Sequence, residues 1–99
     1  MDERDPTTER LLRRVLNEET QKRGLDYHEL RSRNTGMSIW VDVHLLFPKN
    51  TSIETAHWQA TEIEAAIKSQ MSVPIVMTTH LEPVERHDDT HRALKSEKE

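Results

Sequence analysis

The chain has 99 residues, which suits a single domain, and a formal net charge of −4 without any basic block, so nucleic acid is not an expected partner. It contains no cysteine, which excludes disulfides and thiolate metal ligands. We find no apolar run of about 18 residues and no signal peptide pattern, so no membrane-spanning helix is predicted. With 33% hydrophobic residues the core must be small, and a partner subunit or a bound metal would add stability.

Residues 6–24 are predicted to form the first helix. Pro6 suits the first turn, Thr7 or Thr8 is the predicted N-cap, and Gly24 is a good terminator. The apolar side chains recur at helical spacing and form one stripe: Leu11, Leu12, Val15 and Leu16. The opposite side is charged, as in a helix with one buried face.

Residues 27–36 and 37–47 are predicted to form a β-hairpin around the turn signal Asn34-Thr35-Gly36. The second segment, MSIWVDVHLLF, alternates with period two. One face carries Ile39, Val41, Val43 and Leu45, and the other carries Trp40, Asp42, His44 and Leu46. The apolar face is predicted to pack against the core.

A second helix is predicted to begin near residue 51, because Thr51 and Glu54 have the spacing of a capping box. Its buried stripe is Ile53, Ala56, Ala60, Ile63 and Ile67. Residues 74–83, PIVMTTHLEP, are predicted to form a third strand that ends at Pro83. Within it, His80 and Glu82 point away from the core-facing side chains.

The predicted order α-β-β-α-β indicates an α+β fold of the ferredoxin-like type, with two helices on one face of a three-stranded sheet. We assign residues 1–83 to one domain. Residues 84–99 are polar without apolar periodicity, and we expect disorder over most of this tail.

The uncovered sheet face is the predicted site of chemistry. Alternation places His44, His80 and Glu82 there, while His28 shares its parity with Leu30, which leaves its direction open. His57 lies in the first turn of the second helix. Imidazoles with a carboxylate suit Zn²⁺ or another borderline divalent ion. Any one of these histidines alone would more often be an ordinary surface residue, and it is their common facing that favours a metal site.

Four further residues are candidate additional ligands. Trp40 and Asp42 share the uncovered face, although an exposed aromatic also marks interfaces and Asp42 alone is an ordinary solvated carboxylate. His87 and His91 lie in the acidic stretch HLEPVERHDDTH, where they suit chelation only if the tail becomes helical. The simpler interpretation of this tail is a solvated, unstructured end.

Four segments carry a family resemblance: YHELRSRNTG, VDVHLL, ETAHWQATEIEAAI and IVMTTHLEP. In this order and spacing the chain resembles, from about residue 24 to residue 83, the cytoplasmic C-terminal domain of the cation diffusion facilitator (CDF) family of zinc and other divalent-metal transporters. The resemblance implies a fold similar to copper metallochaperones, a V-shaped homodimer beneath a membrane transporter, and regulatory metal at the dimer interface.

The family motifs match residue by residue, and as metal ligands the resemblance implies His28, His44, His57, His80 and Glu82. Some members that transport other metals use a Trp and an acid in the second strand, and Trp40 and Asp42 match that pair. Because both sets are present, the subset that binds metal stays open.

We therefore predict a cytosolic metal-sensing and dimerisation domain of a divalent-cation efflux transporter, with Zn²⁺ as the metal and Cd²⁺, Fe²⁺ or Mn²⁺ as other candidates. Its transmembrane domain is absent from this chain, and the predicted location is the cytoplasmic side of a bacterial inner membrane. The alternative is a free-standing metal carrier of the same fold. An enzyme is not predicted, because we find no nucleophile or general-base constellation.

Overall fold

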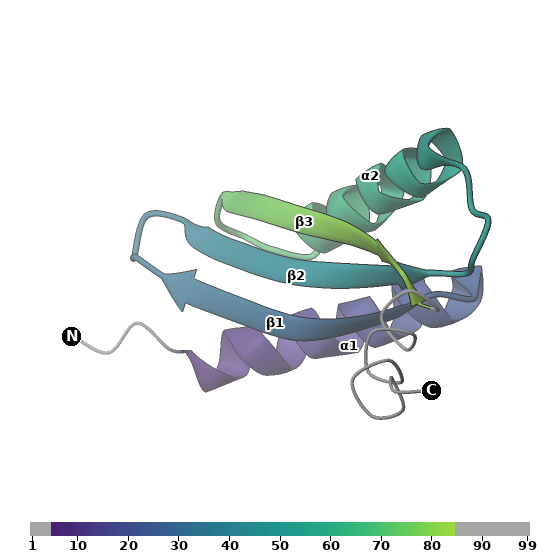
Figure 1. Cartoon of the computed structure of the whole chain (residues 1–99). Coiled ribbons are helices and arrows are strands. Elements are labelled where there is room, and N and C mark those ends of the chain that lie inside the picture. The colour runs from purple at the N-terminus through teal and green to yellow at the C-terminus, as the bar shows by residue number, and fades with distance from the viewer. Residues whose placement is uncertain (1–4, 85–99) are drawn as a thin grey trace, which may run out of the picture.

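The computed structural model describes residues 5–84, which form α1 (Pro6–Arg23), β1 (Asp26–Asn34), β2 (Ile39–Phe47), α2 (Ile53–Ser69) and β3 (Ile75–Pro83). The sheet has the order β1-β2-β3, with β1 antiparallel and β3 parallel to β2. Both helices cover one face of this sheet (Figure 1). The predicted element order, hairpin and layer arrangement are confirmed. No helix within residues 5–84 combines the length and apolarity needed to cross a membrane.

The core lies between the helices and the central strand β2. Every second residue of β2 is buried: Ile39, Val41, Val43, Leu45 and Phe47. They meet the predicted stripes of the two helices, where Leu12, Leu16, Ile63 and Ile67 are fully buried. Ile53, predicted to belong to the buried stripe of the second helix, is instead 86% exposed, because α2 begins at this residue, outside the core cluster. The remaining β2 residues therefore face away from the helices, onto what we call the outer face of the sheet.

Strand β1 contains a β-bulge that the alternation pattern did not predict. His28 pairs with His44, and the next paired residues are Arg31 and Asp42. Strand β1 thus advances by three residues where β2 advances by two, so one extra residue is inserted into β1.

The extra residue resolves the parity conflict between His28 and Leu30. Glu29, between them, has a left-handed backbone conformation with φ 54°. Leu30 is buried in the core, while His28 lies opposite His44 on the outer face. A left-handed conformation costs a residue other than glycine roughly 1–2 kcal/mol. The fold accepts this cost at Glu29, beside the candidate site.

The N-cap predictions were wrong by one to three residues. The side chain of Asp5, rather than Thr7 or Thr8, caps α1 and accepts hydrogen bonds from the Thr8 backbone N–H (3.4 Å) and hydroxyl (2.7 Å). Pro6 occupies the first helical turn, which leaves Asp5 as the flanking residue.

The second helix is capped by Ser52 instead of Thr51. The Ser52 hydroxyl accepts from the backbone N–H of Thr55 at 3.0 Å. The Thr51 hydroxyl is used elsewhere, because it donates to the carbonyl oxygen of Pro48 at 2.6 Å. Gly24 ends α1 as predicted, with a left-handed φ of 72°.

The predicted polar tail, residues 84–99, lies outside the described residues except for Val84. Its disorder and the domain boundary at residue 83 stay predictions.

Asp5 also ties the start of α1 to the sheet, because it accepts a hydrogen bond from Asn34 Nδ2 at 3.0 Å. The Thr8 hydroxyl, and then Asn34, hold the pKa of the Asp5 carboxyl below its ordinary value. A carboxyl with a lowered pKa stabilises the fold fully above its ordinary pKa of about 3.9, and this contribution is lost as the pH falls through the lower folded-state value.

We expect Asp5→Ala to lower the melting temperature at pH 7 and the loss to shrink as the pH falls below about 4, near the ordinary pKa of Asp. Asp5→Asn keeps a capping oxygen for the Thr8 backbone N–H but turns an NH2 group toward Asn34 Nδ2, so it should retain only part of the stability. Melting curves followed by circular dichroism at several pH values measure both effects. Equal melting temperatures for wild type and Asp5→Ala at pH 7 would show that this cap is dispensable.

Candidate metal centre

The register between β2 and β3 brings most of the predicted ligands together. His44 stands beside His80, and Glu82 beside Leu46, in the parallel pairing. Because of the bulge, His28 joins His44 from the other side. Three strands thus contribute to one patch on the outer face. His44, on the central strand, lies in the middle of this patch.

The first cluster consists of His28, His44 and Glu82. His44 Nδ1 lies 2.5 Å from one oxygen of Glu82, and His28 Nε2 lies 3.4 Å from the other. The three side chains are 24–32% exposed, so they are partly desolvated but reachable from solvent. Each can offer one ligand atom such that all these atoms lie within 4.8 Å of one another.

Glu82 is held as an anion by its neighbours. The hydrogen bond from His44 is the main cause of a lowered pKa for the Glu82 carboxyl; partial burial opposes the lowering, and His28 adds to it. A carboxylate that stays ionised well into the acid range is available as a ligand whenever the imidazoles are deprotonated.

The second cluster consists of Asp42, His44 and His80, and it shares His44 with the first. His80 Nε2 lies 2.9 Å from Asp42 Oδ1, a buried oxygen that receives no well-directed hydrogen bond. The rings of His44 and His80 are stacked, with centroids 4.4 Å apart and planes 16° from parallel.

This stacking distinguishes the two clusters. The lone pair of an imidazole nitrogen lies in the ring plane, so two stacked rings direct their lone pairs side by side instead of toward one point. His80 must therefore turn before it can share an ion with His44. The rings of His28 and His44 are close to perpendicular, at 89°, and are free of this restriction.

The first cluster fits a divalent metal. Two ligand atoms of a tetrahedral zinc ion lie roughly 3.3 Å apart, given bonds of about 2.0–2.1 Å. The distances from the Glu82 oxygens to His44 Nδ1 and His28 Nε2 are 2.5 and 3.4 Å. Small side-chain rotations can bring both distances to this value. Two imidazoles and one carboxylate also occur together at zinc sites.

Several predicted ligands lie elsewhere. His57 is on the exposed side of α2 and in neither cluster of the described residues. Trp40 is on the outer face, 46% exposed, with the Arg33 guanidinium 5.9 Å above its ring. His87 and His91 lie outside the described residues.

One nearby carboxylate was not singled out from the sequence. Glu29, the bulge residue, places Oε1 3.4 Å from His44 Nε2. The available signal was the conflict between His28, a candidate ligand, and Leu30, an apolar residue of the same parity, since a bulge resolves such a conflict.

The architecture is that of a ferredoxin-like, metallochaperone-like α+β domain, and the comparisons with known proteins specify its family. Residues 5–84 match the family described as cation efflux protein, cytoplasmic domain. The chain belongs to this family, which is one of transporter domains, not of enzymes. The predicted resemblance is confirmed.

Individual relatives agree with this assignment. An uncharacterised transporter of Synechocystis sp., sll1263, is 32% identical over 65 residues, which are 66% of this chain and 21% of that protein. The chain thus spans about a fifth of its curated relative.

Solved structures of the candidate zinc transporter CzrB are also similar. One is 29% identical, with a TM-score of 0.73, and the match covers 81% of this chain and 96% of that chain. A zinc form of CzrB is 33% identical, with a TM-score of 0.72 and coverage of 84% and 93%. A variant of MamM-CTD, at 20% identity, has a TM-score of 0.64 with coverage of 76% and 95%, which supports the fold alone.

Because both clusters contain His44, we expect His44→Ala to weaken zinc binding more than any other single change on the outer face. The loss should exceed about a hundredfold, since changes in residues that merely support metal ligands cost about 10–100-fold. Titration calorimetry measures it, with Thr78→Ala as a control on the same face. If His44→Ala binds zinc like wild type, neither cluster is the site.

Proposed function

We propose that this domain senses a divalent cation, zinc in the first place, and regulates the transport activity of the efflux protein to which it belongs. The convergence of His28, His44 and Glu82 on the outer face carries this proposal. Family membership favours a transporter domain over the free-standing metal carrier that the sequence also allowed. The zinc form of CzrB, at 33% identity, is a further reason to choose zinc over Cd²⁺, Fe²⁺ or Mn²⁺.

The chemistry of the site depends on these side chains in distinct ways. Glu82 supplies a charge that stays negative, which offsets part of the metal's charge in a half-buried site. His28 and His44 supply neutral nitrogens, which favour zinc over Mg²⁺ or Ca²⁺ because those ions prefer oxygen. Asp42 and His80 form a second site, or extend the first, once the His80 ring has turned.

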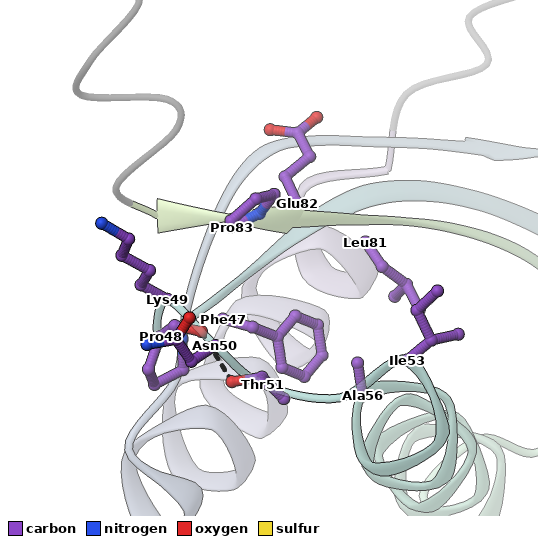
Figure 2. A pocket seen from close by; sticks show the side chains of 10 residues that line it. All are labelled: Phe47, Pro48, Lys49, Asn50, Thr51, Ile53, Ala56, Leu81, Glu82 and Pro83. Carbon is purple, nitrogen blue, oxygen red and sulfur yellow. Dashed lines mark hydrogen bonds between the residues drawn. The ribbon is translucent and has the colours of Figure 1, made fainter.

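We further propose that the domain acts as a homodimer at the cytoplasmic side of a bacterial inner membrane. A groove of about 570 Å³ opens between the end of β3 and the start of α2, and Figure 2 shows Leu81 directed toward Ile53 across it. Ile53 is 86% exposed and Leu81 38%. Exposed apolar groups of this kind mark protein interfaces, and a second copy that inserts the same residues would bury them symmetrically.

In this arrangement metal binding draws the two protomers together. His57 lies on the exposed side of α2 and in neither cluster of the described residues, so a metal ligand role for it calls for the cluster of the other protomer. His57 therefore stays a predicted ligand, contributed in trans. Closure of the dimer is the signal that the transporter would receive.

Zinc should raise the melting temperature of the domain by several degrees at pH 7.5. A ligand that binds only the folded state at a hundredfold excess over its Kd stabilises by about 2.7 kcal/mol. Below about pH 6 the effect should fall steeply, because protons compete with the metal for the lone pairs of the imidazole ligands. Differential scanning fluorimetry at pH 5.5 and 7.5 measures both. An unchanged melting curve at pH 7.5 would refute zinc sensing, and equal shifts at the two pH values would assign the metal to carboxylates alone.

Ile53→Arg should weaken the dimer at least roughly fivefold, the cost of losing an interface residue worth more than about 1 kcal/mol. The matched control is Met37→Arg, since Met37 is 83% exposed but lies in the β1–β2 turn at the opposite end of β2. Sedimentation velocity over a concentration series reports the change. Equal dissociation constants for the two variants would remove the groove from the interface.

A further inference from the structure

We propose that Glu29 is a positioning residue of the metal site: its carboxylate holds the His44 imidazole through Nε2, so that Nδ1 is presented to the metal. This inference rests on the proposed function, because it assigns a role in a metal site formed by the first cluster. The proposal adds Glu29 to the site as a residue that does not itself bind the metal.

The two ring nitrogens of His44 face two different carboxylates. Nδ1 lies 2.5 Å from Glu82, whose other oxygen lies 3.4 Å from His28 Nε2, and Nε2 of His44 lies 3.4 Å from Glu29 Oε1. A metal placed between His44 and Glu82 would therefore take Nδ1, the ring nitrogen that lies beside Glu82. A neutral imidazole that ligates through Nδ1 carries its proton on Nε2, the nitrogen that lies 3.4 Å from Glu29 Oε1.

Ligand histidines in proteins commonly donate their second N–H to a carboxylate or a carbonyl oxygen, which fixes both the tautomer and the ring orientation. Among the described residues, Glu29 is the one observed to contact His44 Nε2. Its carboxylate is therefore placed to accept this hydrogen bond. Without it, the ring of His44 would be held from the Nδ1 side only.

The backbone supports the same assignment independently. Glu29 is the inserted residue of the bulge and has φ 54°, a conformation that favours glycine. Its side chain is 52% exposed and so contributes little to the core. Strained backbone of this kind concentrates at functional sites, and here a glutamate occupies a position where glycine would relieve the strain.

The decisive variant is Glu29→Gly, because it separates folding from metal binding. Without zinc, its melting temperature should equal or exceed that of wild type, since glycine adopts the left-handed conformation without a steric penalty. Its zinc affinity should nevertheless fall by about 10–100-fold. Glu29→Gln keeps a side-chain oxygen that accepts the N–H and should lose less than Glu29→Gly.

Glu54→Gln serves as the charge control, since it removes one negative charge at an exposed position in the first turn of α2. It should bind zinc like wild type. A comparable loss in Glu54→Gln and Glu29→Gln would reduce the effect to net charge and overturn the proposal.

The tautomer of His44 gives a readout that a purely structural role would not change. In the zinc-loaded wild type, side-chain ¹⁵N NMR should show His44 ligated at Nδ1 and protonated at Nε2. In zinc-loaded Glu29→Gly the Nε2–H signal should broaden or shift, because its acceptor is gone. Ligation through Nε2 in the wild type would overturn the assignment.

The outcomes separate this proposal from the function on which it rests. If wild type does not bind zinc in titration calorimetry, both fall. If wild type binds zinc and Glu29→Gly binds it equally well, metal sensing survives and the role of Glu29 is refuted.

Discussion

The burial of one face of β2 is the constraint on which the rest of this structure depends. Five residues of this strand pack against two helices, and the pleat leaves no choice for the residues between them. Asp42 and His44 must face outward because Val41, Val43 and Leu45 face inward. A shift of the register by one residue would bury both polar side chains and expose the core, so the position of His44 is secured by the hydrophobic energy of the whole domain.

Around this rigid residue, the neighbouring strands are arranged by different means. The parallel pairing with β3 brings His80 beside His44 in a regular ladder. The pairing with β1 would place Leu30 and His28 on the same face if it were regular, and the bulge separates them. The outer face therefore combines an ordered side, where rings stack, with an irregular side, where His28 and Glu29 approach His44 from a distorted backbone.

The strong periodic patterns made much of the fold predictable from the sequence. The alternation in β2 and β3 and the stripe of Ala56, Ala60, Ile63 and Ile67 correctly indicated element types, order and facing, whereas Ile53 at the start of α2 is exposed and not part of the buried stripe. The caps were not predictable in the same way, because Asp5, Thr7 and Thr8 are all good capping residues and only the backbone decides among them.

The candidate site likewise has features that the sequence predicted and features that it did not. The shared facing of His44, His80 and Glu82 follows from a period of two, so the sequence was enough. The direction of His28 and the approach of Glu29 depend on one inserted residue; the parity conflict between His28 and Leu30 signals an irregularity there, but it does not give the conformation of Glu29. The position of His57 relative to the cluster depends on how α2 crosses the sheet, and the sequence spacing carries no information on that geometry.

Leu81 and Glu82 are consecutive residues of β3 that point to opposite sides of the strand, as Figure 2 shows. Both residues line the groove beside α2, and Glu82 also belongs to the first cluster, on the outer face. No loop or hinge separates them, so their movements are coupled through a single peptide unit. The candidate metal cluster and the groove thus share one short piece of backbone, so a displacement at one would reach the other without any long pathway through the core.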